Sequence, residues 1–462
     1  MSAGANPTPD NVREELRQLL TLAAPIILAQ LSQMGLGVAD TIMAGRVSAT
    51  DLAGVALGGN LYFPLLMLIS GVVMSINPTV SQLSGAGRES ESGEVVRQAL
   101  WIALVGGLLL IAILQTAAPL YRSMGVDPLA IPVAAAYLQA LSFGVLPVLG
   151  YLALRYFCEG LSWTTPAMLV AAGALALKIP LNYLFIYGGL GIPAMGGVGC
   201  GWATAIVGVF QCTAMAMIVG MRRLHHTGFY ARFSPPDWHH IRKLIVLGVP
   251  IGAMVFMEIA LFSGTTLVIG RLGVAAVAAH QIAMNVGGIA FMVPLALGIA
   301  ASIRVGNQTG AGNFAGARRS GQVAIGASLA FALVMAIALL AGRDLMASLY
   351  TKEPEVMMLA AHLMLFAAGF QFFDASQATV IGGLRGYKDT RTPMLVAAVA
   401  YWVVGFPIAV IFGLGFLGAP TLGVSGFWLG LTVGLGVASF ALLARFRWLS
   451  RRPQRIQELA QH

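Results

Sequence analysis

The chain has 462 residues, of which 58% are hydrophobic and only 10% are charged, and its mean hydropathy is +0.82. This number of charged residues is too small to cover the surface of a water-soluble domain. The composition therefore excludes a soluble globular protein and indicates many membrane spans. The formal net charge of +9 needs no nucleic acid as a partner, because basic residues beside apolar segments are orientation signals that lie next to anionic lipid.

Apolar runs of about 20 residues, the length that a helix needs to cross a hydrocarbon core of roughly 30 Å, recur along the chain. The runs are continuous and lack the in-out alternation of an outer-membrane strand, so they predict helices. The predicted spans are 19–45, 52–78, 95–120, 131–158, 165–187, 197–220, 244–270, 277–303, 322–349, 356–384, 392–415 and 422–446. The sequence thus predicts an all-α integral membrane protein with twelve transmembrane helices.

The Lys and Arg residues set the orientation of these spans. A cytoplasmic N-terminus places most of the 27 basic residues on the cytoplasmic side and leaves Lys178 within a span. The basic residues on the opposite side are then Arg46, Arg122, Arg271, Arg343 and Lys352. This bias predicts cytoplasmic N- and C-termini. We expect a multi-pass protein of the bacterial inner membrane.

The two halves of the chain match when one is shifted by 225 residues. Pro25 then meets Pro250, and the "GAG" at 85–87 meets the "GAG" at 310–312. Six spans in each half is an even number, so the halves share one orientation and are predicted to be lobes related by a pseudo-twofold axis along the membrane normal. Parallel repeats of this kind are typical of alternating-access carriers.

The repeat predicts the domain organisation. We expect an N-terminal lobe at 1–220 (helices 1–6), a cytoplasmic inter-lobe linker at 221–243, and a C-terminal lobe at 244–462 (helices 7–12) with a basic cytoplasmic tail. The chain has no P-loop, GxxxxGK[ST], so an ion gradient rather than ATP is the expected source of energy. The three cysteines lie within spans without CxxC spacing, which predicts neither a disulfide framework nor a metal site.

Four charged residues lie well inside the predicted spans: Asp40, Glu258, Asp374 and Lys178. An ionised carboxylate at mid-membrane costs roughly 2.5–3.5 kcal/mol, so such residues are candidates for function. A carboxyl group that is buried near a second one holds its proton at a higher pH than an exposed one does, which lets it carry a proton near neutral pH. The plainer alternative for each is a structural acid satisfied by amide or backbone donors.

Helical spacing places polar neighbours beside these carboxyl groups. Asp40 shares one helix face with Gln33 and Gly37, and we expect this face to line a cavity. Glu258 and Asp374 both lie near mid-membrane in the second half, so they are expected to approach each other. The residues expected to line a substrate cavity are Gln33, Met257, Phe370, Gln371 and Gln377.

Several motifs resemble those of one known family. They are "ADTIMAG" at 39–45, "NYLFIYG" at 182–188 followed by "GGVGCG", "MEIALF" at 257–262, and "FDASQ" at 373–377 followed by "GLRGYKDT". Over about residues 15–445 the chain resembles the NorM-type branch of the MATE (multidrug and toxin extrusion) transporters. The motifs occur at matching positions in both halves, so the resemblance is specific.

The resemblance implies a function and a set of site residues. It implies a V-shaped pair of lobes that opens alternately to each side and exports cationic, lipophilic drugs and dyes in exchange for H⁺ or Na⁺. The family's coupling carboxylates fall on Asp40, Glu258 and Asp374, and its helix-bending proline falls on Pro25, which in the plainer interpretation merely ends a first turn. We expect no cofactor, small-molecule cations as substrates, membrane lipid as the surroundings and a monomer.

Two departures from the family pattern favour H⁺ as the coupling ion. Sodium-coupled relatives tend to carry a tyrosine where this chain has Phe370, and family members often carry two asparagines where it has Lys178 and Asn182. Hard cations need several oxygen ligands, and each half has lost one. Na⁺ remains the alternative. Lys178 is either a tethered cation, which pairs with Asp40 in one conformation and leaves it in another, or a static partner that fixes the lobe.

Other functional classes fit the sequence less well. A lipid-linked sugar flippase of the same superfamily is expected to have a strongly basic cavity, whereas this interior offers three acids and one base. An inward-running solute symporter is harder to exclude from charge alone. An intramembrane aspartyl protease would carry a G-x-G-D signature, which is absent, so we do not expect an enzyme.

Overall fold

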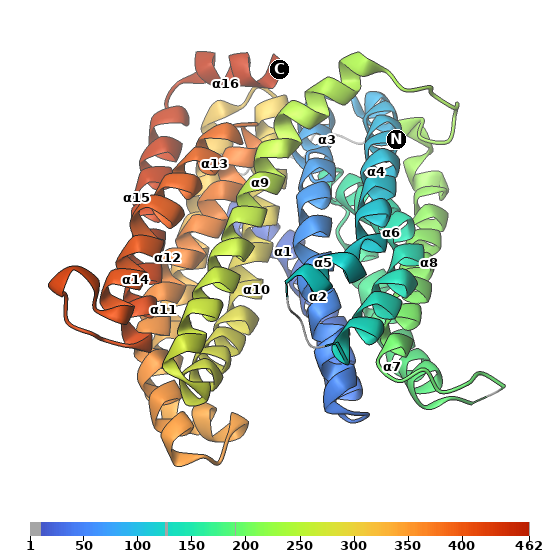
Figure 1. Ribbon diagram of the computed structural model, residues 1–462. Helices are drawn as coiled ribbons and strands as arrows, with labels where there is room; N and C mark the ends of the chain where they lie inside the picture. The colour runs from blue at the N-terminus through green and yellow to red at the C-terminus, as the bar shows by residue number, and fades with distance from the viewer. Residues whose placement is uncertain (1–10, 125–127, 190, 462) are drawn as a thin grey trace. The chain divides into compact units, whose positions relative to one another are not determined.

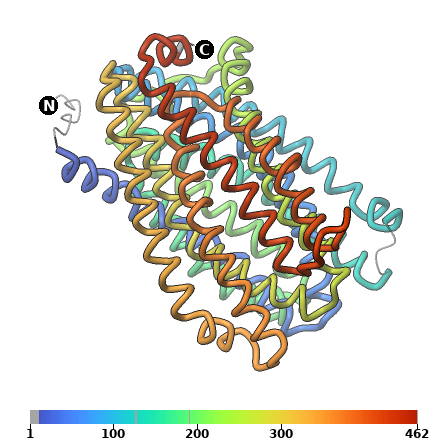
Figure 2. Tube along the Cα trace, turned by 90° about the vertical axis from the view of Figure 1, so that its left-hand side faces the viewer, coloured from blue at the N-terminus to red at the C-terminus, as the bar shows by residue number. Residues whose placement is uncertain are grey.

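The computed structural model describes residues 11–124, 128–189 and 191–461 (Figures 1 and 2). Within these residues the regular elements are helices, apart from one isolated β-bridge between Gly189 and Ile192. In lipid a backbone can satisfy its polar groups within one segment only as a helix, which explains the fold of such apolar runs. Twelve helices of the described part are long and apolar enough to cross a membrane, so the predicted number of spans and the all-α class are confirmed.

The elements fall into two consecutive sets. The first is α1 (Val12–Gly45), α2 (Ala49–Val73), α3 (Ile76–Gly85), η1 (Glu89–Glu91), α4 (Ser92–Gln115), α5 (Ala117–Ser123), α6 (Ala130–Gly160), α7 (Thr165–Tyr187), α8 (Val198–Val219) and η2 (Arg222–Thr227). The second is α9 (Trp238–Ile269), η3 (Gly270–Leu272), α10 (Val274–Gly310), α11 (Phe314–Tyr350), α12 (Pro354–Gly386), α13 (Arg391–Ala397), η4 (Ala398–Gly405), α14 (Phe406–Leu414), η5 (Phe416–Gly418), α15 (Val424–Leu449) and α16 (Pro453–Gln461).

Several helices differ in extent from the apolar runs that predicted them. The first helix begins at Val12 rather than at residue 19, and Glu14 and Glu15 lie in its first turn, where the helix dipole favours negative charge. The eleventh span is predicted as one helix over 392–415, but its middle, η4, is π-helical. A helix can therefore extend past its apolar run into polar residues, so the run alone does not give the ends of the helix.

Contacts between Cα atoms divide the chain into two compact units. Unit 1 consists of Met1–Ala23 and Ala253–His462, and unit 2 consists of Ala24–Gly252. Both boundaries fall inside helices, α1 and α9, next to the paired prolines Pro25 and Pro250. The N-terminal part of each of these two helices therefore belongs to one unit, and the remainder of the same helix belongs to the other unit. The division into 1–220, 221–243 and 244–462 stays a prediction.

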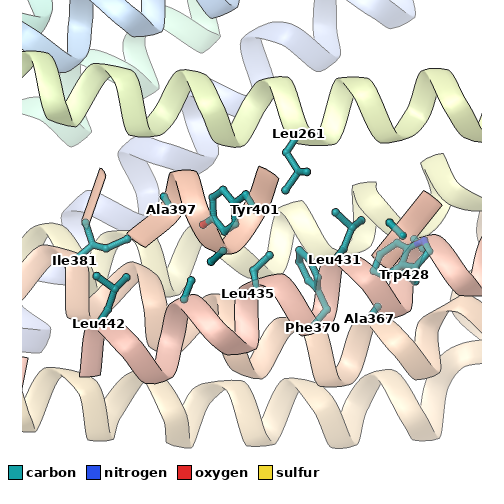
Figure 3. Close-up of a cluster of buried hydrophobic side chains, with 14 of the residues drawn as sticks. Leu261, Ala367, Phe370, Ile381, Ala397, Tyr401, Trp428, Leu431, Leu435 and Leu442 are labelled. Carbon is teal, nitrogen blue, oxygen red and sulfur yellow. The ribbon is translucent and has the colours of Figure 1, made fainter. Parts of the chain in front are cut away.

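Each unit has its own buried apolar core. In unit 1, α12 packs against α10, α11 and α15, and large buried side chains such as Trp428 and Tyr401 fill the interior (Figure 3). In unit 2, α6 packs against α2, α4 and α8, with Tyr151 and Phe157 buried between helices. The two central helices, α6 and α12, are counterparts in the sequence repeat.

Matching contacts in the two units support the internal duplication. A Cβ atom added to Gly160 on α6 would meet the side chain of Val80, and one added to Gly386 on α12 would meet the side chain of Val305. These pairs correspond under a shift of 225 or 226 residues. Because a glycine is needed at the same close approach in both units, the repeat extends from the sequence to the packing of its helices.

Candidate functional site

Asp40, Lys178 and Asn182, which the sequence analysis singled out, come together in unit 2. The Lys178 ammonium nitrogen lies 2.9 Å from Asp40 Oδ1, and Asn182 Nδ2 donates a hydrogen bond of 2.8 Å to the same oxygen. Asp40 is 8% exposed, and the other two side chains are fully buried. Lys178 and Asn182 are four residues apart on α7, so one face of that helix presents both to α1.

Thr204 and Cys200 on α8 complete this arrangement, which we name the Asp40 cluster. Thr204 Oγ1 lies 3.4 Å from Asp40 Oδ2, and Lys178 Nζ donates to the Cys200 carbonyl oxygen at 3.2 Å and to Thr204 Oγ1. An ammonium group has three hydrogens to donate, and here it has three acceptors. The cation of the Asp40 cluster is thus supplied by the chain and fully hydrogen-bonded.

Polar residues of α1 that precede Asp40 in the sequence bond to α6. Gln33 Nε2 donates to the Tyr151 hydroxyl at 3.2 Å, and Gln30 Oε1 accepts from Arg155 at 2.8 Å. Arg155 also pairs with the fully buried Glu159 at 2.7 Å. The face of α1 that was expected to line a cavity is therefore partly engaged by α6, and Gln33 is half-buried.

A second polar group lies in unit 1 around Asp374 on α12. Asp374, Gln371 and Gln377 are buried, and Glu258 on α9 is half-buried and interacts electrostatically with Asp374. Gln377 Nε2 donates to the hydroxyl of Tyr401. We name these five residues the Asp374 cluster.

Several polar atoms of the Asp374 cluster have no hydrogen-bond partner among the described residues. They are Asp374 Oδ1, Gln377 Oε1 and both amide atoms of Gln371. A buried polar group without a partner costs about 1–3 kcal/mol. The cluster therefore offers uncommitted oxygen atoms to a proton or a cation, whereas in the Asp40 cluster the ammonium of Lys178 already occupies three acceptors and Asn182 Oδ1 is the one buried oxygen without a partner among the described residues.

Phe370 lies one turn before Asp374 and belongs to the apolar core. Its ring packs edge-on against Trp428, with centroids 5.5 Å apart, and against Phe262 at 6.1 Å (Figure 3). Met257, the neighbour of Glu258 on α9, is half-buried. The roles of Phe370 and Met257 in a substrate cavity stay predictions.

His280 on α10 is a buried titratable residue that the sequence analysis missed. Trp428 Nε1 can only donate, so His280 Nδ1 accepts its bond of 3.2 Å, and His280 Nε2 lies 3.0 Å from Thr266 Oγ1. Thr266 in turn donates to the carbonyl of Phe262 at 2.9 Å. The chain of bonds fits a neutral imidazole with its hydrogen on Nε2, and it holds the aromatic rings around Phe370.

Two buried ion pairs were also missed. Glu15 on α1 pairs with Arg304 on α10 through two bonds of 2.9 and 2.7 Å in unit 1, and Arg155 pairs with Glu159 in unit 2. Arg155 lies near the end of the predicted span 131–158, and Arg304 directly follows the predicted span 277–303. The spacing of four residues between Arg155 and Glu159 is a signal of a helical pair, whereas Glu15 and Arg304 are too far apart in sequence to give one.

Comparison with known proteins identifies the family. The profile of the MatE family matches residues 25–184 and 250–411, one match in each half of the chain. "Multidrug resistance protein MdtK" of Yersinia pseudotuberculosis is 41% identical over 441 residues, which cover 95% of this chain and 96% of that protein. The protein of that name from Yersinia enterocolitica gives the same identity and coverage.

Solved structures share the fold. A crystal structure of a MATE protein in complex with MaL6 covers all of both chains with a TM-score of 0.86 at 20% identity. The eukaryotic MATE transporter AtDTX14 has a TM-score of 0.86 at 19% identity and covers 97% of this chain and 100% of that one. Likeness at this level of identity shows the fold alone. The two family matches, which together span more than half of the chain, show that it belongs to the MATE family, whose members are transporters and not enzymes.

Proposed function

We propose that the protein is a multidrug efflux antiporter of the bacterial inner membrane, which exports cationic, lipophilic drugs by alternating access in exchange for H⁺. The name of the Yersinia relatives, which match nearly the whole chain, supports drug efflux. The observation that carries the coupling is the Asp374 cluster, where a buried carboxyl group with one free oxygen lies within electrostatic reach of a second carboxyl group. Such a pair is suited to taking up and releasing a proton.

The Asp40 cluster supports H⁺ rather than Na⁺. Lys178 already occupies the position next to Asp40 Oδ1, and its hydrogens are directed at the acceptors that a metal ion would need. A Na⁺ ion there would face a like charge and find few free oxygen atoms. Next to the Asp374 cluster, Phe370 lies one turn before Asp374 and offers no hydroxyl group.

Na⁺ coupling is the second candidate, and the oxygen atoms of the Asp374 cluster favour it. Asp374 Oδ1, Gln371 Oε1 and Gln377 Oε1 are free among the described residues, and oxygen atoms are the ligands that hard cations prefer. A transporter of lipid-linked or other solutes in the same superfamily is the alternative of another class. The experiment below decides between H⁺ and Na⁺ and tests whether the substrate is a cationic drug at all.

The experiment uses the purified full chain in liposomes loaded with a cationic dye. An inward H⁺ gradient and an inward Na⁺ gradient are imposed separately, and dye efflux is recorded. Efflux driven by H⁺ alone supports the proposal, and efflux driven by Na⁺ alone replaces it with the second candidate. If neither gradient moves any cationic dye, the drug-efflux function itself is wrong.

We further propose that both termini are cytoplasmic and that a monomer embedded in lipid carries out the cycle. Pro25 is the bending point of α1, because it lies inside that helix next to the unit boundary. Gln33 and Met257, both half-buried, are proposed to contact the drug. No cofactor is proposed.

Lys178 is proposed to be the tethered cation of the Asp40 cluster. Replacement by asparagine leaves a buried carboxylate without its charge partner, and breaking a buried pair costs about 3–5 kcal/mol. We expect Lys178→Asn to lower the rate of H⁺-driven efflux about tenfold or more, or to make efflux respond to Na⁺. Initial rates in the liposome assay under each gradient test this.

Lys243→Asn is the matched control, since it makes the same change at an exposed cytoplasmic position, and it is expected to behave as wild type. A static lysine would make Lys178→Asn less stable to heat without changing the driving ion or the rate per folded molecule. That outcome would rule out the tethered cation.

A further inference from the structure

The eleventh span departs from a regular helix at a defined place. The backbone N–H of Phe406 donates to the carbonyl of Tyr401, five residues back, which is the spacing of a π-helix. Pro407 follows directly, and a proline has no N–H and pushes aside the carbonyl four residues before it. Short π-helical turns occur frequently at functional sites. The turn is therefore encoded by the sequence, and its buried side chain is a candidate for function.

Small residues let α15 pack closely against this turn. A Cβ atom on Gly405 would lie 3.1 Å from the Cα atom of Gly434 and 3.2 Å from the Gly430 carbonyl oxygen. Such close approach between helices is typical of glycine-rich membrane interfaces. The π-helical turn is thus held between Pro407 and a tight helix contact, which fixes the direction of its side chains.

Tyr401 is the residue of the turn that belongs to the Asp374 cluster. Its side chain is 1% exposed and lies among Leu261, Leu435 and other apolar residues (Figure 3). Its hydroxyl accepts a hydrogen bond from Gln377, which is one turn after Asp374 on α12. A phenol in apolar surroundings normally finds polar partners for its hydroxyl, and here α12 supplies them.

The hydroxyl of Tyr401 still has a hydrogen to donate. A phenol is both a donor and an acceptor, and the bond from Gln377 uses it as an acceptor. Asp374 Oδ1 and Gln377 Oε1 are acceptors with no partner among the described residues. The titratable groups that act on Tyr401 are Glu258 on α9 and Asp374 on α12, so both candidate coupling carboxyls lie within electrostatic reach of the phenol.

The other unit offers a parallel arrangement. The fifth span, α7, is the repeat counterpart of the eleventh, with Pro180 matching Pro407, and it supplies Lys178 and Asn182 as donors to Asp40. At the position of Tyr401 the fifth span has Ala174. In unit 2 this helix of the repeat thus brings donors to an intramembrane aspartate, whereas in unit 1 it brings the hydroxyl of Tyr401 to Gln377, one turn after Asp374.

We infer that Tyr401 is a positioning residue of the coupling site, whose hydroxyl donates to the ionised form of Asp374 and accepts from Asp374 once that group has taken up a proton. The phenol keeps its own hydrogen throughout, and the transported proton stays on Asp374 until it is released. This inference rests on the proposed function, in which Asp374 carries the coupling proton.

The test is Tyr401→Phe, which removes one oxygen atom and keeps the buried ring. We expect the maximal rate of H⁺-driven dye efflux to fall about tenfold, the scale of one hydrogen bond to a charged group, with the apparent KM for dye unchanged. A carboxylate that loses a donor holds its proton to higher pH. The pH of half-maximal rate is therefore expected to rise by about one unit.

Tyr387→Phe is the matched control. Tyr387 is another buried phenol of unit 1, at the end of α12, and its hydroxyl has no partner among the described residues. It is expected to keep the wild-type rate and pH profile. Pro407→Ala is a second variant, which keeps the hydroxyl but allows a regular helix at the turn, and it is expected to reproduce the effect of Tyr401→Phe.

The outcomes separate the inference from the proposed function. If wild-type efflux runs on Na⁺ and not on H⁺, the proposed function fails before any variant is measured. If the wild type runs on H⁺ and Tyr401→Phe shows its rate and pH profile, the inference alone is wrong. A lower rate with an unchanged pH profile, together with a lower melting temperature, would make Tyr401 structural and would also overturn the inference.

Discussion

Asp374→Asn is expected to abolish H⁺-driven dye efflux. Asparagine has nearly the shape of aspartate but cannot take up and release a proton, so the variant keeps the packing of α12 and loses the exchange. We expect the rate to fall by about 100-fold or more, the scale on which loss of a proton-transferring group acts. Initial rates at equal amounts of reconstituted protein measure the effect.

Asp344→Asn on α11 is the matched control for this change. Its carboxyl group is exposed, and its contact with Arg343 is a surface contact of 3.8 Å. It is expected to transport at the wild-type rate. Should Asp374→Asn transport dye under an H⁺ gradient at more than about a tenth of the wild-type rate, Asp374 would not be the coupling group.

Glu258 should act together with Asp374 rather than independently. The two groups interact electrostatically, so the charge on one changes how readily the other takes up a proton. Glu258→Gln therefore changes the pH dependence of transport as well as its rate. Combining the two substitutions is expected to cost little more than Asp374→Asn alone, because residues that act as a unit are not additive.

The Asp40 cluster shows what the sequence could predict about the site. A lysine and an aspartate within apolar runs need each other in lipid, and Asn182 follows Lys178 by one helical turn, so the pairing follows from charge and spacing. Thr204 could not be predicted in the same way. A threonine carries no charge penalty in a span, and its partner lies on another helix that only the tertiary packing brings close.

Tyr401 shows a second limit of sequence reasoning. Its neighbours in the eleventh span are apolar, so the sequence predicts a regular helix over 392–415. The π-helical turn before Pro407 changes which face each later side chain occupies. Because the register shifts inside the span, helical spacing could not predict the contact between Tyr401 and Gln377, although Pro407 is visible in the sequence as a helix-breaking signal.

The buried ion pairs were missed because the ends of long helices lie beyond the apolar runs. Glu15 and Arg304 flank predicted spans in the sequence, where charged residues are normally solvated or near headgroups. In the structure both are 2–3% exposed, and Ser320 on α11 also donates to Glu15 at 2.6 Å. Burial at these positions depends on contacts between distant segments of the chain.

Buried ion pairs hold both parts of α1. The part of α1 up to Ala23 belongs to unit 1 and is fastened there by Glu15 and Arg304, whereas the part from Ala24 belongs to unit 2 and is fastened there by Asp40 and Lys178. A buried ion pair therefore holds each end of the helix, with Pro25 between them. Loss of either pair is expected to act on the stability of the unit that contains it.

Arg304→Met is expected to lower the stability of unit 1 by about 3–5 kcal/mol, because it leaves the Glu15 carboxylate buried without its partner. The double variant Glu15→Leu, Arg304→Met removes both charges, and replacing a buried pair by apolar residues of similar size is often neutral or stabilising. The double variant should therefore recover most of the loss. Thermal unfolding of the purified protein in detergent, followed for the wild type and the two variants, measures this.

Arg88→Met is the matched control. Arg88 pairs with Glu91 through two bonds of 2.6 and 2.7 Å, the same geometry as the buried pair, but both side chains are at least half exposed. An exposed pair contributes about 0–1 kcal/mol, so this variant should melt close to the wild type. Equal melting temperatures for Arg304→Met and Arg88→Met would mean that burial adds nothing to the first pair. The double variant also lacks the arginine side chain. If its melting temperature recovers, the cost of Arg304→Met therefore comes from the unpaired carboxylate and not from lost packing.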